Sequence, residues 1–255
     1  MNTVRDIFDK LCEIAPLELQ LEFDNSGFLI GRADAPVEKA LLSLDVTAEV
    51  AEEAIGRGAQ LIVSHHPVVW DAMKHITDCT PGNEKLIRLL ENGIAVISMH
   101  TNLDMAEGGV NDVLISLLGA KNEGVFDAEG CGRKGSFEKP MPLDSFLAIC
   151  KKKLNTNGLR YHDAGRPVEH IAVLGGSGGG NLIGAWEAGC DTYVTADVKY
   201  SVFLQARELG INLIDGDHFC TENPVIPMLA EKLRAAFPET EFLISERHGQ
   251  TARFF

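Results

Sequence analysis

The sequence predicts an α/β protein made of two similar lobes, each built on a mostly parallel β-sheet. From residue 39, short aliphatic or β-branched runs alternate with amphipathic stretches at helical spacing, which is typical of β-α-β units. The alternation stops in the middle of the chain and then returns. A chain of 255 residues, 45% of them hydrophobic, is long enough to bury a large core. We therefore expect two α/β lobes that face each other.

The first block of alternation ends near residue 120. Its expected strands are "ALLSLDV", "LIVSHH" and "IAVISMH", and its expected helices are "TAEVAEEAIGRGA", "NEKLIRLLENG" and "GGVNDVLISLLG". Gly93 and Gly119 lie where two of these helices should end, because glycine readily adopts the left-handed conformation of a helix C-cap. The first lobe is placed at about residues 1–120.

The second block follows an irregular middle. Residues 121–168 contain a segment rich in glycine and charge, a predicted helix at "PLDSFLAICKKKL" and a candidate strand at "LRYHDAG". Strands are then expected at "HIAVLGG", "DTYVTADV", "INLIDGDHF" and "TEFLISE", with the helices "NLIGAWEAGC", "KYSVFLQARELG" and "NPVIPMLAEKLRAAF" between them. We expect residues 121–168 to connect the lobes and residues 169–255 to form the second lobe.

Composition and charge exclude several classes of protein. The net charge of -14 without a basic patch argues against nucleic-acid partners and anionic lipid surfaces. The N-terminal segment alternates charged and apolar residues, unlike a signal peptide or a membrane anchor. Six well-separated cysteines form no Cys-x-x-Cys pair, which argues against zinc fingers and a disulfide framework. A cytoplasmic protein with reduced, mostly buried thiols is expected.

Acidic and imidazole side chains follow many of the predicted strands. Ligands of open α/β sheets gather at the carboxyl ends of the strands, so these side chains should share one edge. The residues concerned are Asp45, His65, His66, His100, Asp104, Asp197, Asp215, Asp217 and His218.

The histidines differ in how strongly they suggest a site. Neighbouring strand residues point to opposite sides, but the turn at Pro67 lets His65 and His66 swing toward the same rim. The other histidines with helical, loop or tail contexts are not expected to be ligands. They are His75, His162, His170 and His248.

Two further positions have competing interpretations. His218 and Glu222 are four residues apart, which would put them on one face of a helix. Pro224 and Pro227 instead predict that this helix begins near Glu222. Asp104 precedes a predicted helix, where an acidic residue is also an ordinary cap.

As an ordered set, the motifs resemble a known family. The segments are "FDNSGFLIG", "SLDVT", "SHHPVVW", "HTNLD" with "GGVND", "GGSG", "TADVKY" and "GDHFCTE". In this order the chain resembles the GTP cyclohydrolase I type 2 homologues, also called NGG-interacting-factor-three-like proteins. The resemblance covers nearly the whole chain, as one family domain of residues 1–255, in a short form without an inserted domain.

The resemblance implies a dinuclear metal site in a cleft between two α/β lobes, in subunits that form a ring-shaped homohexamer. The metal ligands carried over from the family motifs are His65, His66, Asp104, His218 and Glu222. Two positions depart from the family pattern. This chain has Asp217 before the histidine where a small residue and glycine are usual, and Ser201 where a histidine is frequent.

The chemistry of this ligand set agrees with the resemblance. Imidazoles and carboxylates suit Zn, Fe, Mn or Ni, and the set is too large for one catalytic ion with an open position. Two divalent ions about 3.5 to 4 Å apart would fit, and would generate a hydroxide nucleophile near neutral pH. For His100 two roles are open, a partner that supports a ligand and a general acid. Asp45 and Asp197 could orient ligands or water.

Two questions stay open at this stage. The "GGSGGGN" segment at residues 175–181 fits an anion-binding loop or a tight structural turn, and it fails the dinucleotide fingerprint. Three functions are compatible with the chain: a metal-dependent hydrolase of a phosphate ester or nucleotide, a non-catalytic metal-binding or metal-delivery protein, and a scaffold for protein partners.

Overall fold

The structure, a computed structural model, describes residues 1–80 and 82–254, and it confirms the predicted α/β class with two sheets. The chain divides into two compact units. The first unit is Met1–Ala106 with Ile226–Gly249, and the second is Glu107–Val225 with the tail from Gln250 onward.

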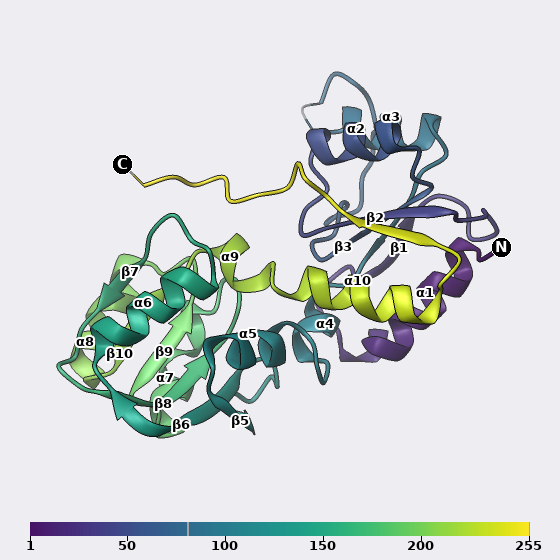
Figure 1. The fold of residues 1–255 in the computed structure, drawn as a ribbon. Coiled ribbons are helices and arrows are strands. Elements are labelled where there is room, and N and C mark those ends of the chain that lie inside the picture. Colours follow the sequence, from purple (N-terminus) through teal and green to yellow (C-terminus); the bar gives the residue numbers. More distant parts are fainter. Residues whose placement is uncertain (81, 255) are drawn as a thin grey trace. The chain divides into compact units, whose positions relative to one another are not determined.

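The sheet of the first unit has five strands in the order β1-β4-β3-β2-β11 (Figure 1). Their bounds are Gly27–Ile30 for β1, Lys39–Ser43 for β2, Leu61–Ser64 for β3, Ala95–Ser98 for β4 and Glu241–Ile244 for β11. All neighbours are parallel except β1, which runs antiparallel to β4. The last strand, β11, thus joins the N-terminal strands through its pairing with β2, whereas the sequence placed it with the second lobe.

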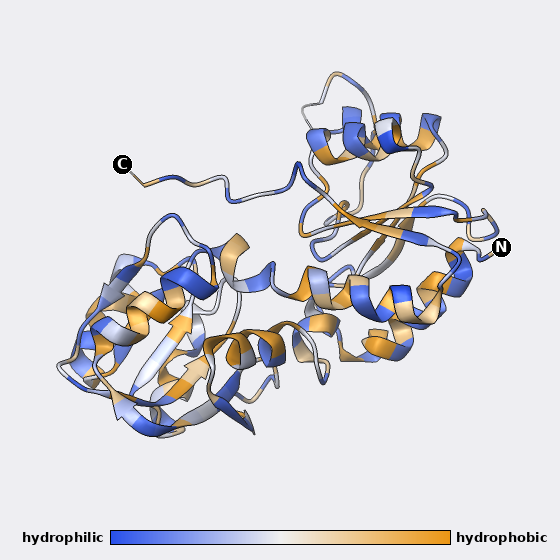
Figure 2. Ribbon diagram, in the orientation of Figure 1, coloured by the Kyte–Doolittle hydropathy of each residue, from blue (hydrophilic) through white to orange (hydrophobic). Residues whose placement is uncertain are grey.

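The helices of the first unit accompany this sheet, and two of them share a core of buried apolar residues with it. Their bounds are Val4–Ile14 for α1, Leu17–Leu19 for the 3-10 helix η1, Ala48–Arg57 for α2, Glu84–Glu91 for α3, Thr101–Met105 for α4 and Val225–Ala236 for α10. Thr47 caps α2 by accepting the Val50 N–H at 3.2 Å, and Gly58 ends it with a φ of 67°. Figure 2 shows the resulting pattern of apolar strands and two-sided helices. The burial of continuous aliphatic runs on β2, β3 and β4 explains why these strands were predictable.

The sheet of the second unit has six strands in the order β5-β6-β8-β9-β10-β7. Their bounds are Lys121–Val125 for β5, Arg133–Met141 for β6, Arg160–His162 for β7, Val168–Val173 for β8, Thr192–Thr195 for β9 and Asn212–Asp215 for β10. Only β8, β9 and β10 are mutually parallel, so this sheet is less parallel than expected. Residues 121–168, expected to be a connection, supply three strands of the sheet and α6.

Helices of the second unit include one that carries predicted ligands. The bounds are Val110–Leu118 for α5, Leu143–Lys153 for α6, Gly179–Asn181 for the 3-10 helix η2, Leu182–Glu187 for α7, Tyr200–Leu209 for α8 and His218–Glu222 for α9. The prediction that this last helix begins near Glu222 was wrong. Asp217 caps α9 by accepting the Cys220 N–H at 3.1 Å, so the helix begins at His218.

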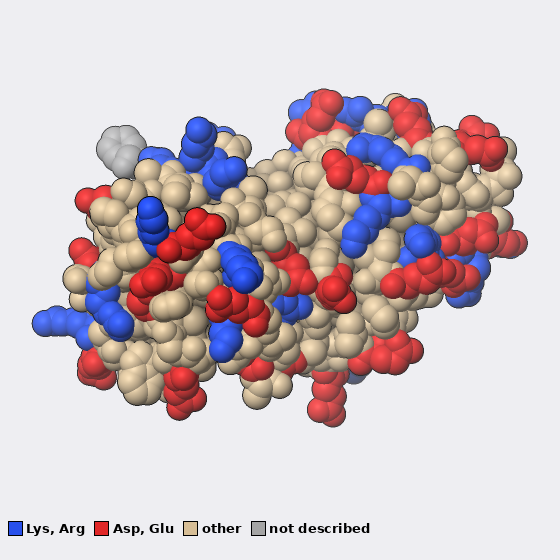
Figure 3. All heavy atoms as spheres, turned by 60° about the horizontal axis from the view of Figure 1, so that its bottom comes forward, with Lys and Arg blue, Asp and Glu red and all other residues tan. Residues whose placement is uncertain are grey.

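The surface carries charges of both signs. Acidic and basic side chains are interspersed on the face drawn in Figure 3. Within residues 1–80 and 82–254, no helix combines the length and the apolar character needed to cross a bilayer.

Candidate metal centre

The carboxyl ends of β3 and β4 bring three imidazoles together in the first unit. These strands are parallel neighbours with Ser64 opposite Ser98, so the residues that follow them emerge side by side. The ring centroids of His65 and His66 are 4.9 Å apart, and each lies within 5.6 Å of the centroid of His100. One nitrogen from each of the three rings lies within 4.8 Å of the others, which makes them a candidate metal-binding group.

Asp104 joins this cluster from α4. Its Oδ1 lies 3.6 Å from the Nε2 of His65, whose side chain is fully buried. The alternative that Asp104 caps the following helix does not hold, because Gly109 is the N-cap of α5. The four site residues predicted in this half of the protein are therefore close to one another.

Each imidazole of the cluster binds an acceptor through Nδ1. The Nδ1 of His65 lies 2.8 Å from the carbonyl oxygen of Met99, and the Nδ1 of His66 lies 2.7 Å from Oδ1 of Asp45. A carbonyl or carboxylate oxygen can only accept, so Nδ1 carries a proton, and in the neutral ring the lone pair is then on Nε2. This tautomer, held by a hydrogen bond on the far nitrogen, is the usual state of a metal-binding histidine.

Asp24 provides the same anchor for His100, and the sequence interpretation missed it. Its buried Oδ1 lies 2.8 Å from the His100 Nδ1, and its other oxygen accepts from Ser26 and from the backbone and side chain of Thr101. Burial raises the pKa of Asp24, but the hydrogen bonds from His100, Thr101 and Ser26 outweigh burial and hold the pKa well below its usual value. The only signal was its place in the "FDNSG" motif, far from any predicted strand end.

In the second unit, α9 presents His218 and Glu222 on one face. The Nε2 of His218 lies 3.1 Å from Oε2 of Glu222, and its Nδ1 lies 2.7 Å from Oδ2 of Asp197. Asp197 follows β9 and His218 follows β10, which are parallel neighbours. In this pair, as in the first unit, a carboxylate lies against the Nδ1 of the histidine. A second carboxylate, which is a candidate metal ligand, lies beside Nε2.

The backbone around this pair is strained. Asp197 and Asp217 have φ values of 51° and 75°, in the left-handed region that residues other than glycine seldom adopt. Asp217, a departure from the family pattern, serves as the α9 cap, and Asp215 pairs with Arg160. Asp215 and Asp217 are therefore structural residues, not members of the ligand pair.

The glycine loop packs against Glu222. The N–H groups of Gly175, Gly176 and Gly178 donate to the side chains of Asn111, Thr221 and Thr195. A Cβ atom added to Gly176 would lie 2.0 Å from Oε1 of Glu222. These contacts favour the structural interpretation of the loop over an anion site.

His248, which the sequence interpretation set aside, contacts the backbone of Leu44, the residue before Asp45. Its Nδ1 accepts the backbone N–H of Leu44 at 3.0 Å, so this ring has the opposite tautomer from the candidate ligands. Burial lowers the pKa of His248 and favours the neutral ring that this bond requires. The sequence interpretation considered His248 only as a possible ligand, so it did not anticipate this hydrogen bond between the C-terminal segment and Leu44.

Comparison with known proteins identifies the family. A family model described as Duf34/NIF3 (NGG1p interacting factor 3) matches residues 2–250. The chain belongs to this family. It is 35% identical over 252 residues to a GTP cyclohydrolase 1 type 2 homolog of Clostridium perfringens, covering 95% of this chain and 96% of that protein. This confirms the family expected from the motifs.

Solved structures of similar proteins share the fold. A Bacillus cereus protein related to NIF3 superposes with a TM-score of 0.95 at 24% identity, covering 100% of this chain and 99% of the other. Reduced HcgD from Methanocaldococcus jannaschii superposes with a TM-score of 0.85 at 27% identity, covering 96% of this chain and 98% of the other. The Duf34/NIF3 fold therefore spans the chain from end to end.

Proposed function

We propose that this Duf34/NIF3 protein holds two divalent metal ions per subunit. The proposed ligands are His65, His66 and Asp104 of the first unit and His218 and Glu222 of the second. The observation that carries the proposal is the set of Nδ1 hydrogen bonds on His65, His66 and His218, which in the neutral ring place the lone pair on Nε2. These side chains fit such ions because imidazole and carboxylate groups are suitable ligands for Zn, Fe, Mn or Ni.

The reaction proposed for the centre is hydrolysis of a phosphate ester or a nucleotide. A pair of bound divalent ions lowers the pKa of water to about 7 and supplies a hydroxide nucleophile. The relatives named GTP cyclohydrolase 1 type 2 homologs suggest a nucleotide. None of the residues described above is assigned to recognition of a guanine base, so the proposed substrate is named only as a phosphate ester or a nucleotide.

His100 is proposed as the proton carrier of the reaction. Its Nδ1 proton is held by buried Asp24, so only Nε2 can accept a proton and return it. The Asp24 carboxylate would also stabilise the imidazolium that forms. His100 would then assist a leaving group next to His65 and His66 without binding an ion itself.

The test measures metal content first and turnover second. The protein is purified without chelator, ions are counted by elemental analysis, and phosphate esters and nucleotides are screened. His65→Ala and Glu222→Ala should lose both metal and turnover, while His75→Ala, at an exposed histidine outside the cluster, should keep both. Turnover that survives both ligand substitutions would remove the hydrolase. Stoichiometric metal without turnover would favour a metal-delivery protein.

The assembly proposed from the family resemblance is a ring-shaped homohexamer. Support comes from large apolar side chains exposed on two helices of the second unit that contact each other, namely Ile183 and Trp186 on α7 and Tyr200 and Leu204 on α8. Exposed apolar surface of this kind commonly marks a protein interface. Light scattering of the purified protein measures the mass, and a monomer at micromolar concentration would contradict the proposal.

A further inference from the structure

The backbone of one residue in the first unit, Leu44, connects several parts of the histidine cluster. The carbonyl oxygen of Leu44 accepts the backbone N–H of His65 at 3.2 Å and that of His66 at 2.9 Å. The next residue, Asp45, holds the ring of His66 through Nδ1. A rotation of the peptide group between Leu44 and Asp45 would therefore disturb both the backbone and the ring anchor of the paired histidines.

His248 holds the preceding peptide group, between Ser43 and Leu44, whose carbonyl oxygen lies 3.3 Å from the His65 N. The Leu44 N–H donates to the His248 Nδ1 at 3.0 Å. The two residues are 204 positions apart, so the bond depends on the placement of the C-terminal segment. A buried peptide N–H that loses its acceptor costs about 1–3 kcal/mol, which gives the peptide a reason to move when the ring is removed.

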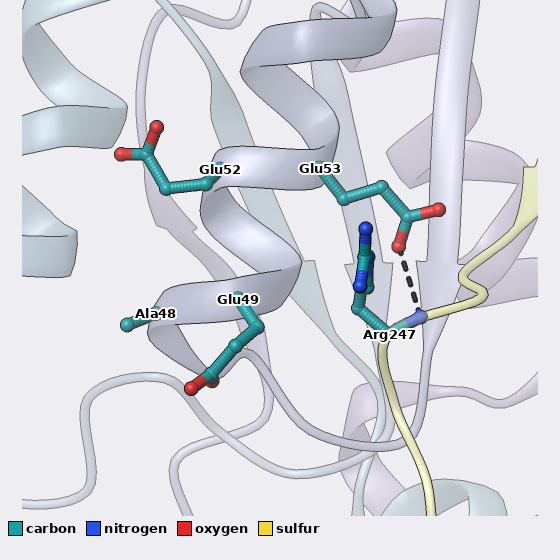
Figure 4. A pocket seen from close by; sticks show the side chains of 5 residues that line it. All are labelled: Ala48, Glu49, Glu52, Glu53 and Arg247. Atoms are coloured by element: carbon teal, nitrogen blue, oxygen red, sulfur yellow. Dashed lines mark hydrogen bonds between the residues drawn. The ribbon is translucent and has the colours of Figure 1, made fainter.

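Glu53 of α2 fixes the turn that carries His248 (Figure 4). Its carboxylate, on a side chain only 6% exposed, accepts the Ser245 hydroxyl at 2.5 Å and the Arg247 N–H at 3.2 Å. The Ser245 hydroxyl oxygen in turn accepts the His248 N–H at 3.2 Å. The turn is thus tied to α2 on one side and follows β11 on the other, so the His248 ring has little freedom.

We propose that His248 is a positioning residue for the metal centre. It fixes the backbone of Leu44 through the N–H, so that the following peptide group, His66 and Asp45 keep the geometry that presents the His66 Nε2 to an ion. Glu53 supports this role by holding the turn. The inference rests on the proposed metal function for its consequence, because the residue itself touches neither an ion nor a substrate.

The alternative is that His248 only packs the C-terminal segment. Two substitutions separate these readings. His248→Asn places an amide oxygen near the position of Nδ1 and can still accept the Leu44 N–H. His248→Leu keeps a side chain of similar size but has no acceptor. If His248 only packs, both variants should change the metal affinity to the same extent. If His248 positions the Leu44 backbone, the asparagine variant should keep the metal affinity that the leucine variant loses.

The first measurement is metal affinity, by competition between the full-length protein and a chromophoric chelator for Zn²⁺. His248→Leu should weaken binding about 10- to 100-fold, the range seen when the partner of a metal ligand is lost, and His248→Asn should stay within about 3-fold of wild type. Arg247→Ala is the control, because its backbone N–H still reaches Glu53 while its exposed side chain is removed. Equal affinity of the leucine variant and wild type would overturn the proposal.

The second measurement uses metal-free protein, so it tests the positioning role of His248 even if the wild-type protein binds no metal. NMR of ¹⁵N-labelled protein follows the His66 Nδ1 proton and the exchange of the Leu44 amide. In His248→Leu the Leu44 amide should exchange faster and the His66 Nδ1 signal should shift or broaden, while the asparagine variant resembles wild type. Unchanged signals in the leucine variant would contradict the positioning role. Urea unfolding of each variant establishes that the comparison is made on folded protein.

Discussion

The sharpest test of the second-unit ligand pair is Gly176→Ala. An added Cβ would lie 2.0 Å from Oε1 of Glu222 and 3.2 Å from Nε2 of His218. Ordinary contact begins near 3.4 Å, so the carboxylate must retreat by more than an ångström. Glu222 is only 4% exposed, and a neighbouring glycine, Gly175, packs against its Cγ, so it has little room to do so.

The expected result is loss of metal with retention of the fold. The φ of +68° adds a strain of about 1–2 kcal/mol to any alanine at Gly176. Gly189→Ala is the matched control, because Gly189 has a φ of +82° and nothing within 4 Å of the added atom. Both variants should lose similar unfolding free energy in urea from backbone strain, but only Gly176→Ala should lose bound metal by elemental analysis. If Gly176→Ala retains the metal content of wild type, Glu222 is not a ligand or the loop does not position it.

Three further predictions concern stability and reactivity. The depressed pKa of Asp24 means that its ionised form stabilises the folded protein above the unfolded pKa near 3.8, and that this contribution is lost as pH falls below that value. Asp24→Asn should thus lower the unfolding free energy by about 1–3 kcal/mol at pH 7, and it should make this free energy depend less on pH in the acid range, as measured by urea unfolding. An unchanged pH dependence in the acid range would contradict the role given to the Asp24 hydrogen bonds. Burial raises the pKa of Cys150 and of Cys220 to about 12, whereas Cys79 is exposed, so a thiol reagent at pH 7.5 should label Cys79 at once and the other two only after unfolding. Rapid labelling of Cys220 in folded protein would refute its burial beside the ligand pair. Removal of metal by chelator should lower the melting temperature, since free ion at 100 times its dissociation constant stabilises the fold by about 2.7 kcal/mol, and the effect should vanish in His65→Ala.

The sequence predicted those parts of the fold that depend on continuous apolar runs. The buried strands β2, β3 and β4 and the parallel strands β8, β9 and β10 were all recognised for this reason. By contrast, β5 lies at a sheet edge with mostly exposed residues, and four of the nine residues of β6 are charged, so neither shows an apolar run. The residues of β2 that pair with β11 lie 202 positions earlier in the sequence, as Lys39 does relative to Glu241, and only tertiary packing selects them.

The candidate site was predictable to the same extent. Polar residues at the ends of parallel strands converge for a geometric reason, and this brought His65, His66 and His100 into one group. Asp24 contacts His100 from a loop, and His248 contacts the Leu44 backbone from the C-terminal turn. Their roles depend on hydrogen bonds formed only in the folded chain, so no local pattern could have revealed them.

The two units solve the orientation of a histidine in the same way. In the first unit, Asp45 follows β2 and holds the Nδ1 of His66, which follows the parallel neighbour β3. In the second unit, Asp197 follows β9 and holds the Nδ1 of His218, which follows the parallel neighbour β10. The acid precedes the histidine by 21 residues in both cases, the length of one strand-helix-strand step.

This repeated geometry explains why an α/β unit suits such a ligand. Adjacent parallel strands place their following residues about 5 Å apart, which is the separation that a carboxylate and an imidazole need for an Nδ1 hydrogen bond. The helix between the strands then fixes their register, so neither side chain has to be positioned by a flexible loop. Asp45→Asn and Asp197→Asn should accordingly have similar effects, since an amide can present its N–H to Nδ1 and favour the tautomer with the proton on Nε2. Each variant should weaken Zn²⁺ binding about 10- to 100-fold in chelator competition, and a large effect of one with none of the other would show that the two histidines do not serve equivalent roles.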